Sequence, residues 1–94
     1  MALERVVFSG HAVRRMFERS ITQAHVLQVL NEGEIIADYP EDEPYPSRLL
    51  LGFAGGRPLH VVAASDSAGG TLIVVTVYRP DAGLWDPGFR RRRT

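Results

Sequence analysis

The sequence of 94 residues contains no cysteine and no lysine. The missing cysteine excludes disulfide bonds, a thiolate nucleophile and a cysteine-bound zinc site. All eleven basic residues are arginine, whose planar guanidinium can bind a phosphate or a carboxylate through two hydrogen bonds. A chain of this length has room for one core and for a shallow site only. We expect a single domain over residues 1–94, with a tail at 81–94 that ends in basic residues. Trp85 and Phe89 are expected to dock this tail on the domain before its four arginines leave the fold.

Long hydrophobic runs are also missing. The longest run, residues 72–77, is interrupted by Thr76 and is far too short to span a bilayer. The first residues, Met-Ala-Leu-Glu-Arg, lack the hydrophobic stretch of a signal peptide. The histidines at positions 11, 25 and 60 lack the short spacing of metal ligands. We therefore expect a cytoplasmic protein with no membrane contact, no metal and no cofactor.

The formal net charge is zero, yet charges of each sign are clustered along the chain. Acidic residues gather between positions 32 and 43, whereas four consecutive arginines occupy positions 90–93. The chain is therefore not neutral locally. Two interpretations of the arginine tail remain open: it binds nucleic acid through salt-sensitive phosphate contacts, or it is a mobile end that aids solubility.

Two amphipathic helices are expected after a short strand. Ser9 and Thr22 are good N-cap residues, and Gly33 is typical of the end of a helix. We expect the first helix at about residues 10–19 and the second between Thr22 and Gly33. Apolar residues at helical spacing predict that each helix has one inward side. These residues are Ala12, Val13, Met16 and Phe17 in the first helix and Val26, Leu27, Val29 and Leu30 in the second.

The remainder of the chain has the composition of β-structure. Runs rich in β-branched residues predict strands at residues 5–8, 34–39, 47–54, 58–66 and 71–79. Glycine pairs predict hairpin turns after the third and fourth of these runs, and the proline-rich segment 40–46 predicts an exposed acidic loop. The predicted fold class is α+β, with two N-terminal helices packed on a curved, mainly antiparallel sheet of about four strands.

The last strand has two different faces. Alternation with a period of two places Ile73, Val75 and Val77 on the expected core face. Thr76 and Tyr78 then lie on the outer face, on the side where a substrate can bind.

The face that His60 occupies depends on the register of the last hairpin. A three-residue loop at 68–70 places His60 opposite Tyr78, whereas a slip of one residue turns it into the core. We favour the first register, because a histidine is more easily hydrogen-bonded on an open face.

Several of these side chains suit the cleavage of RNA by its own 2′-hydroxyl group. That reaction needs a base, an acid and cations that stabilise the charge on the phosphate. His60 or His11 can act as base or acid, because imidazole titrates near neutral pH. Tyr78 can hydrogen-bond the phosphate or protonate the leaving group. The expected phosphate clamps are Arg15, Arg19 and Arg79. Each of these residues also has a purely structural interpretation, such as a solvated helix face.

Four segments of the chain resemble the bacterial family DUF4258, a domain of unknown function. They are His11-Ala-x-x-Arg15-Met-x-Glu-Arg19-x-Ile21-Thr, Val26-x-x-Val29-Leu30, Arg57-Pro-Leu-His60-Val-Val and Val75-Thr76-Val-Tyr78-x-Pro80. The resemblance covers nearly the whole chain and keeps the order of its elements.

This resemblance implies a compact fold similar to RelE and MqsR toxins, of the RelE/barnase–colicin-like type. It also implies a setting beside zinc-finger antitoxins, or at the C-termini of secreted polymorphic toxins. The family pattern marks His11, Arg15, Arg19, His60, Thr76 and Tyr78 in this sequence. The lack of lysine and of excess positive charge differs from strong RelE-type toxins and argues against ribosome-dependent cleavage.

The leading hypothesis is a toxin of a toxin–antitoxin pair, an mRNA interferase-like domain that cleaves RNA without a metal. Its expected partners are RNA and a cognate antitoxin, with a homodimer left open. The alternative is a non-catalytic module that binds a protein through its sheet edge or acidic loop, or nucleic acid through its arginine tail. The sequence leaves open whether the protein is an enzyme.

Overall fold

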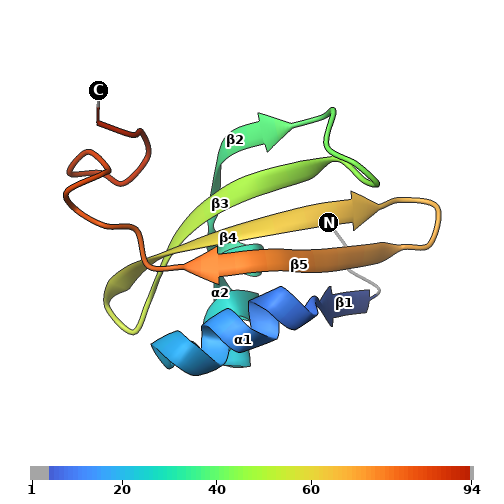
Figure 1. Ribbon diagram of the computed structural model, residues 1–94, viewed down its shortest axis with the longest axis horizontal. Helices are drawn as coiled ribbons and strands as arrows, with labels where there is room; N and C mark the ends of the chain where they lie inside the picture. The colour runs from blue at the N-terminus through green and yellow to red at the C-terminus, as the bar shows by residue number, and fades with distance from the viewer. Residues whose placement is uncertain (1–4, 94) are drawn as a thin grey trace.

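Two helices and five strands follow one another along residues 5–93, the part of the chain that the computed structural model describes (Figure 1). In chain order they are β1 (Arg5–Phe8), α1 (Gly10–Arg19), α2 (Gln23–Glu32), β2 (Glu34–Tyr39), β3 (Ser47–Ala54), β4 (Arg57–Asp66) and β5 (Thr71–Tyr78). The predicted elements are confirmed, although β4 begins and β5 ends one residue earlier than expected. Both ends of the predicted domain, residues 1–4 and 94, lie outside the described residues. Most of the N-terminal segment, which was expected to lack a signal peptide, lies outside them as well.

Within the described residues the strands form one sheet, in the order β1–β5–β4–β3–β2. β1 runs parallel to β5, and the other neighbouring strands are antiparallel. The α+β class is confirmed, but the sheet is mixed and has five strands instead of about four. Local hydrophobic periodicity predicts where strands lie and not which strands pair, so the β1–β5 pairing was not foreseen.

Both predicted N-caps are confirmed. The Ser9 hydroxyl accepts a hydrogen bond from the Ala12 amide at 3.0 Å, and the Thr22 hydroxyl accepts one from the His25 amide at 3.1 Å. His25 Nδ1 accepts in return from the Thr22 amide at 3.4 Å, which completes a capping box. Glu or Gln usually fills this position, so the sequence did not predict the role of His25.

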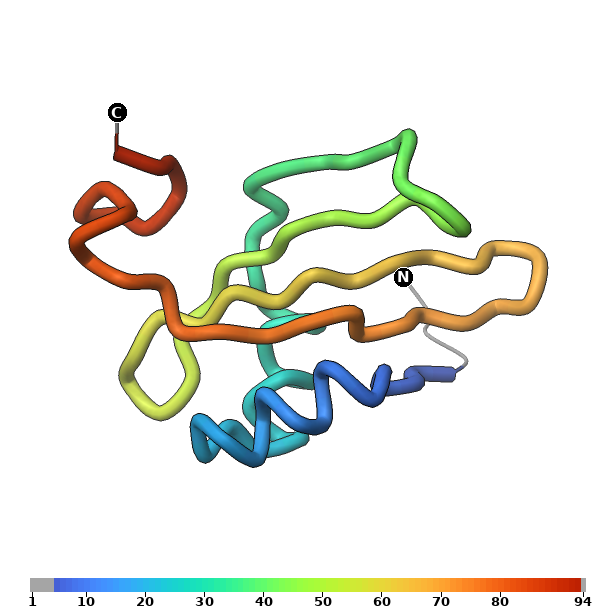
Figure 2. Tube along the Cα trace, in the orientation of Figure 1, coloured from blue at the N-terminus to red at the C-terminus, as the bar shows by residue number. Residues whose placement is uncertain are grey.

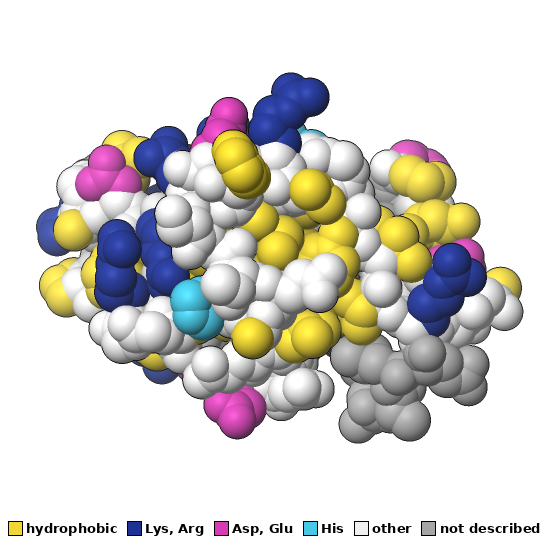
Figure 3. Space-filling view, turned by 90° about the horizontal axis from the view of Figure 1, so that it is seen from below, with side chains coloured by type: hydrophobic (Ala, Val, Ile, Leu, Met, Phe, Trp, Pro, Cys, Tyr) yellow, Lys and Arg dark blue, Asp and Glu magenta, His cyan; other side chains and the backbone are white. Residues whose placement is uncertain are grey.

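Helix α1 buries a narrower side than its sequence predicts. Ala12 and Met16 are buried as expected, but Val13 is 53% exposed and Phe17 is 87% exposed. The prediction that these two face inward is wrong, because α1 packs mainly against β5, near one edge of the sheet (Figure 1). Hydrophobic side chains consequently remain in view on the side of the molecule that carries the helices (Figure 3).

The core lies between the helices and the sheet. Val26 and Val29 of α2 are buried in it, whereas Leu27, also predicted to face inward, is 37% exposed. The strands complete this core with Ala54, Leu59, Val61, Val74 and Val77.

A β-bulge at Val75 decides which residues of β5 enter the core. Val74 and Thr76 pair with consecutive residues of β4, so Val75 between them has no partner there. The bulge reverses the alternation of side chains. Val74 and Val77 are therefore fully buried, whereas Val75 is 37% exposed. The prediction that residues 73, 75 and 77 form the core face holds for Val77. It is wrong for Val75 and for Ile73, which adjoins the buried Val74 and so points to the opposite face.

The same bulge gives the last hairpin the register that was predicted for it, although the loop is longer than predicted. The loop between β4 and β5 comprises four residues, 67–70, and not the three that were predicted. Without the bulge, this longer loop would place His60 opposite Val77. With it, His60 lies opposite Tyr78, as predicted.

The two ends of the sheet carry different loops. The acidic loop, residues 40–46, joins β2 to β3 without helix or strand, as predicted. The chain after β5 folds back over the opposite end of the sheet (Figures 1 and 2). Neither of the described helices is long and apolar enough to cross a membrane.

Leu59→Ala is expected to lower the free energy of unfolding by about 3 kcal/mol, because it opens a cavity in the core. Leu59 is fully buried, whereas Leu84 is 51% exposed, so Leu84→Ala serves as the matched control. The control is expected to change stability by less than about 0.5 kcal/mol. Urea denaturation followed by circular dichroism measures both. A loss below about 1 kcal/mol for Leu59→Ala would contradict the placement of this side chain in the core.

Candidate functional site

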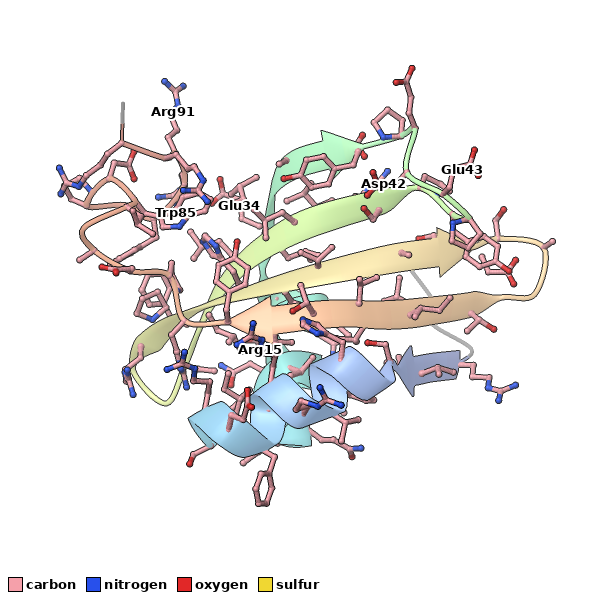
Figure 4. All side chains as sticks on the ribbon, viewed as in Figure 1. Arg15, Glu34, Asp42, Glu43, Trp85 and Arg91 are labelled. Carbon is pink, nitrogen blue, oxygen red and sulfur yellow. The ribbon has the colours of Figure 1, made fainter. Side chains whose placement is uncertain are left out.

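A groove of about 580 Å³ lies between α1 and the end of β5. It is lined by His11, Arg15, Arg19, Arg57, Thr76, Val77, Tyr78, Arg79 and Asp81. Helix α1 contributes the first three at intervals of four residues, which places them on one side of the helix. Figure 4 shows Arg15 between α1 and β5. The groove brings together every residue predicted for the site except His60.

The groove exists because β1 is short. β1 pairs with Thr71–Val74 only, so within residues 5–93 no strand pairs with the rest of β5 on that side. The residue after β1, Ser9, donates from its amide to the Val74 carbonyl at 3.0 Å and from its hydroxyl to the Val75 carbonyl at 2.8 Å. These bonds fix the start of α1 at the bulge. The helix then runs beside the half of β5 that β1 does not cover.

Positive charge predominates in the groove. Four arginines line it, against the single carboxylate of Asp81. Arg15 approaches Glu18 at 3.8 Å, and both side chains are largely exposed, so this pair is weak. Within residues 5–93, the other three arginines have no carboxylate within 4.0 Å. The groove therefore attracts anions although the whole chain is neutral.

Arg79 is partly committed to the fold. Its Nη1 donates to the carbonyls of Ala54, Arg57 and Pro58 at 3.1–3.2 Å and so holds the β3–β4 turn beside the groove. Its Nε is buried and has no hydrogen-bond partner among residues 5–93. Burial, and then the nearby charge of Arg57, lower the pKa of Arg79. The predicted phosphate clamp thus supplies charge to the groove while bonding to the backbone.

His60 shares a face of the sheet with Tyr78, as predicted, but this face is covered. Its imidazole is fully buried. Nδ1 lies 3.2 Å from the Tyr78 hydroxyl, and Nε2 lies 2.8 Å from the Phe89 carbonyl oxygen. The Trp85 ring packs against the imidazole edge to face, with 4.5 Å between ring centroids. The expectation of an open face is therefore wrong, because residues after β5 fold over His60.

The segment that covers His60, residues 81–93, is called the C-terminal strap. Trp85 forms a β-bridge with Arg92, whose guanidinium carbon lies 5.5 Å from the centre of the indole. Arg90 donates to both carboxylate oxygens of Glu34 at 2.8–3.0 Å. The docking of Trp85 and Phe89 was predicted. The four arginines were expected to leave the fold, which is wrong for Arg90 and Arg92.

Burial sets the proton state of the His60–Tyr78 pair. Desolvation lowers the pKa of His60, and its hydrogen bond with Phe89 only partly opposes this shift. Desolvation also raises the pKa of Tyr78. At neutral pH, both side chains are therefore uncharged.

Sequence reasoning missed three contributors to the site. Arg57 lies in the Arg57-Pro-Leu-His60 motif, which marked it without giving it a role, and Asp81 follows β5 directly. Phe89 acts through its carbonyl oxygen, which no side-chain pattern could reveal.

The model of one protein family, described as "Domain of unknown function (DUF4258)", matches residues 8–79. Comparisons with curated proteins and with solved structures give no significant match. The matched segment contains His60 and every groove residue except Asp81. It ends before the C-terminal strap.

The stability of the fold is expected to depend on pH through His60. Because its pKa lies below the ordinary 6.5, the unfolded chain binds a proton that the folded chain does not. This contribution is complete above pH 6.5 and is lost as the pH falls below that value, by at most about 1.4 kcal/mol per pH unit. Urea denaturation of the wild type and of His60→Asn between about pH 5 and 8 measures it. Groups other than His60 titrate in both proteins, so their effects cancel when the two stability curves are compared. Parallel curves would therefore contradict a buried, neutral His60.

Proposed function

The chain belongs to the DUF4258 family, and we propose that its basic groove binds RNA and cleaves it without a metal ion. One observation carries this proposal: His11 and Tyr78 line a single open groove together with Arg15 and Arg19, two of the arginines of α1. An open groove at the side of a small domain suits an extended polymer better than an enclosed metabolite.

Arginines from two parts of the fold would hold the phosphate. Arg15 and Arg19 reach the groove from α1, and Arg57 reaches it from the start of β4. A guanidinium can donate two parallel hydrogen bonds to one phosphate group. Cations on both sides of a phosphodiester would also stabilise the charge that develops during its cleavage.

The proposed reaction is attack by the 2′-oxygen of the ribose on the adjacent phosphorus. The O2′–P bond forms and the P–O5′ bond breaks, which leaves a 2′,3′-cyclic phosphate and a 5′-hydroxyl. A base removes the 2′-hydroxyl proton, and an acid gives a proton to the 5′-oxygen. His11 lines the groove and is exposed, so it is the imidazole that can reach the leaving oxygen. His60 is buried and acts on the RNA only through Tyr78.

The proposal extends to the biological role. We propose a toxin with a RelE- or MqsR-like arrangement that acts on RNA in the cytoplasm and is restrained by a cognate antitoxin. The resemblance of the sequence motifs supports this role. The basic groove, on a scaffold with no net charge, is compatible with it.

Arg15→Gln is expected to weaken the binding of a single-stranded RNA oligonucleotide about tenfold, because it removes a bidentate phosphate contact. Arg14→Gln is the matched control: it makes the same charge change on the same helix, but Arg14 does not line the groove. The control is expected to change affinity by less than about twofold. Fluorescence anisotropy at low salt measures both. Equal losses would mean that the RNA responds to the charge of α1 and does not occupy the groove.

The wild-type chain is expected to cleave RNA in the presence of a chelator, and His11→Ala is expected to cleave it about 100-fold more slowly. Gel analysis of end-labelled RNA also tests for the cyclic-phosphate product. Induced expression in bacteria is expected to arrest growth with the wild type only. Cleavage that the chelator abolishes would refute the metal-independent reaction, and RNA that is bound but left intact would indicate a binding module.

A further inference from the structure

The contacts of His60 determine which atom carries each proton. A carbonyl oxygen only accepts hydrogen bonds, so the 2.8 Å contact with Phe89 requires a hydrogen on Nε2. A neutral imidazole carries a single N–H, and burial favours the neutral form. Nδ1 therefore has a free lone pair, and the Tyr78 hydroxyl, 3.2 Å away, must donate to it.

This arrangement makes Tyr78 an acceptor towards any ligand. The phenol carries one hydrogen, which is directed at His60, and its oxygen keeps a lone pair. Phosphate oxygens are themselves acceptors, so Tyr78 held in this way cannot hydrogen-bond a phosphate. The predicted role of Tyr78, a donor to the phosphate or to the leaving group, is therefore replaced by that of an acceptor.

The sugar–phosphate backbone of a nucleic acid offers only one hydrogen-bond donor, the 2′-hydroxyl of ribose. We infer that Tyr78 distinguishes RNA from DNA by accepting a hydrogen bond from this hydroxyl. The strap, acting through His60, keeps the phenol hydrogen directed at Nδ1 and away from the ligand. The inference rests on the proposed function and adds a determinant of substrate specificity to it. In the proposed cleavage, the phenol oxygen takes the 2′-hydroxyl proton as the phenol proton passes to Nδ1 of His60, and His11 is left to protonate the 5′-oxygen.

The C-terminal strap is built to hold the Phe89 carbonyl in place. Phe89 has a positive φ of 60°, which is costly for a residue with a side chain. Its amide donates to the Asp86 carbonyl at 2.9 Å, and the next amide, of Arg90, donates to the Asp86 carboxylate at 3.2 Å. The Arg90–Glu34 ion pair then ties this turn to the start of β2.

The strap lies beyond the matched segment, which ends at residue 79. Both side chains of this arrangement, His60 and Tyr78, come from inside that segment. The carbonyl that sets the tautomer comes from outside it. His60 is thus a positioning residue, and Phe89 positions it in turn.

The first experiment compares the binding of RNA and DNA oligonucleotides of the same sequence, in the His11→Ala background so that the RNA stays intact. The parent is expected to bind RNA about tenfold more tightly than DNA. Adding Tyr78→Phe is expected to remove this preference by weakening RNA binding alone. Tyr45→Phe, on the acidic loop, is the matched control and is expected to keep the preference.

The outcomes separate this inference from the proposed function. Equal affinity for RNA and DNA in the parent, with both lowered by Arg15→Gln, would overturn the inference and leave phosphate binding in the groove intact. A loss of both ligands with Tyr78→Phe would also overturn it. The absence of binding to either oligonucleotide would overturn both.

The second experiment needs no RNA. Nitrogen-15 NMR of the imidazole groups in the full chain is expected to show His60 as the neutral Nε2–H tautomer at neutral pH. An Nδ1–H tautomer or a charged imidazolium would overturn the inference, because the Tyr78 proton would then be free to face the ligand.

Discussion

The arrangement of this protein depends on the limited parallel pairing of β1 with β5. Four residues of β1 reach only as far as Val74, and Ser9 then bonds to the bulged part of β5. A longer β1 would cover the strand edge that α1 lies beside. Because it stops there, the helix brings His11, Arg15 and Arg19 next to the end of β5. The groove is thus a consequence of an incomplete sheet edge, a position that other proteins protect by pairing or by charge.

Local signals in the sequence were sufficient for the elements and insufficient for their assembly. Ser9 and Thr22 fixed the helix starts through bonds between near neighbours, and glycine pairs located the turns. The exposure of Phe17 depends on how far the sheet extends beneath α1, which helical periodicity cannot report. Most of the residues that line the groove, such as His11 and Arg15, were predicted, because the chemistry of a side chain can be read from the sequence. The covering of His60 was missed, because it depends on the path of the strap and on one backbone carbonyl.

Charge segregation along the sequence becomes segregation in space. Asp42 and Glu43 of the acidic loop lie at the end of the sheet opposite Trp85, and Arg15 lies towards the Trp85 end (Figure 4). A chain with no net charge therefore carries its acidic loop and its basic groove in different places. Such a molecule can orient a polyanion without binding it tightly everywhere, and its acidic loop disfavours an approach from the wrong end.

The Ser9–Val75 hydrogen bond also has a consequence for the order of folding. Its partners are 66 positions apart, so the contact closes more than two thirds of the 94-residue chain into a loop. Contacts of such high sequence separation form late, after the helices and the β3–β4 hairpin can already have formed. During synthesis, β5 is made after the other described helices and strands, so α1 is made long before its neighbouring strand is available. A truncated or unfinished chain would therefore present the arginines of α1 on a helix and never in a groove.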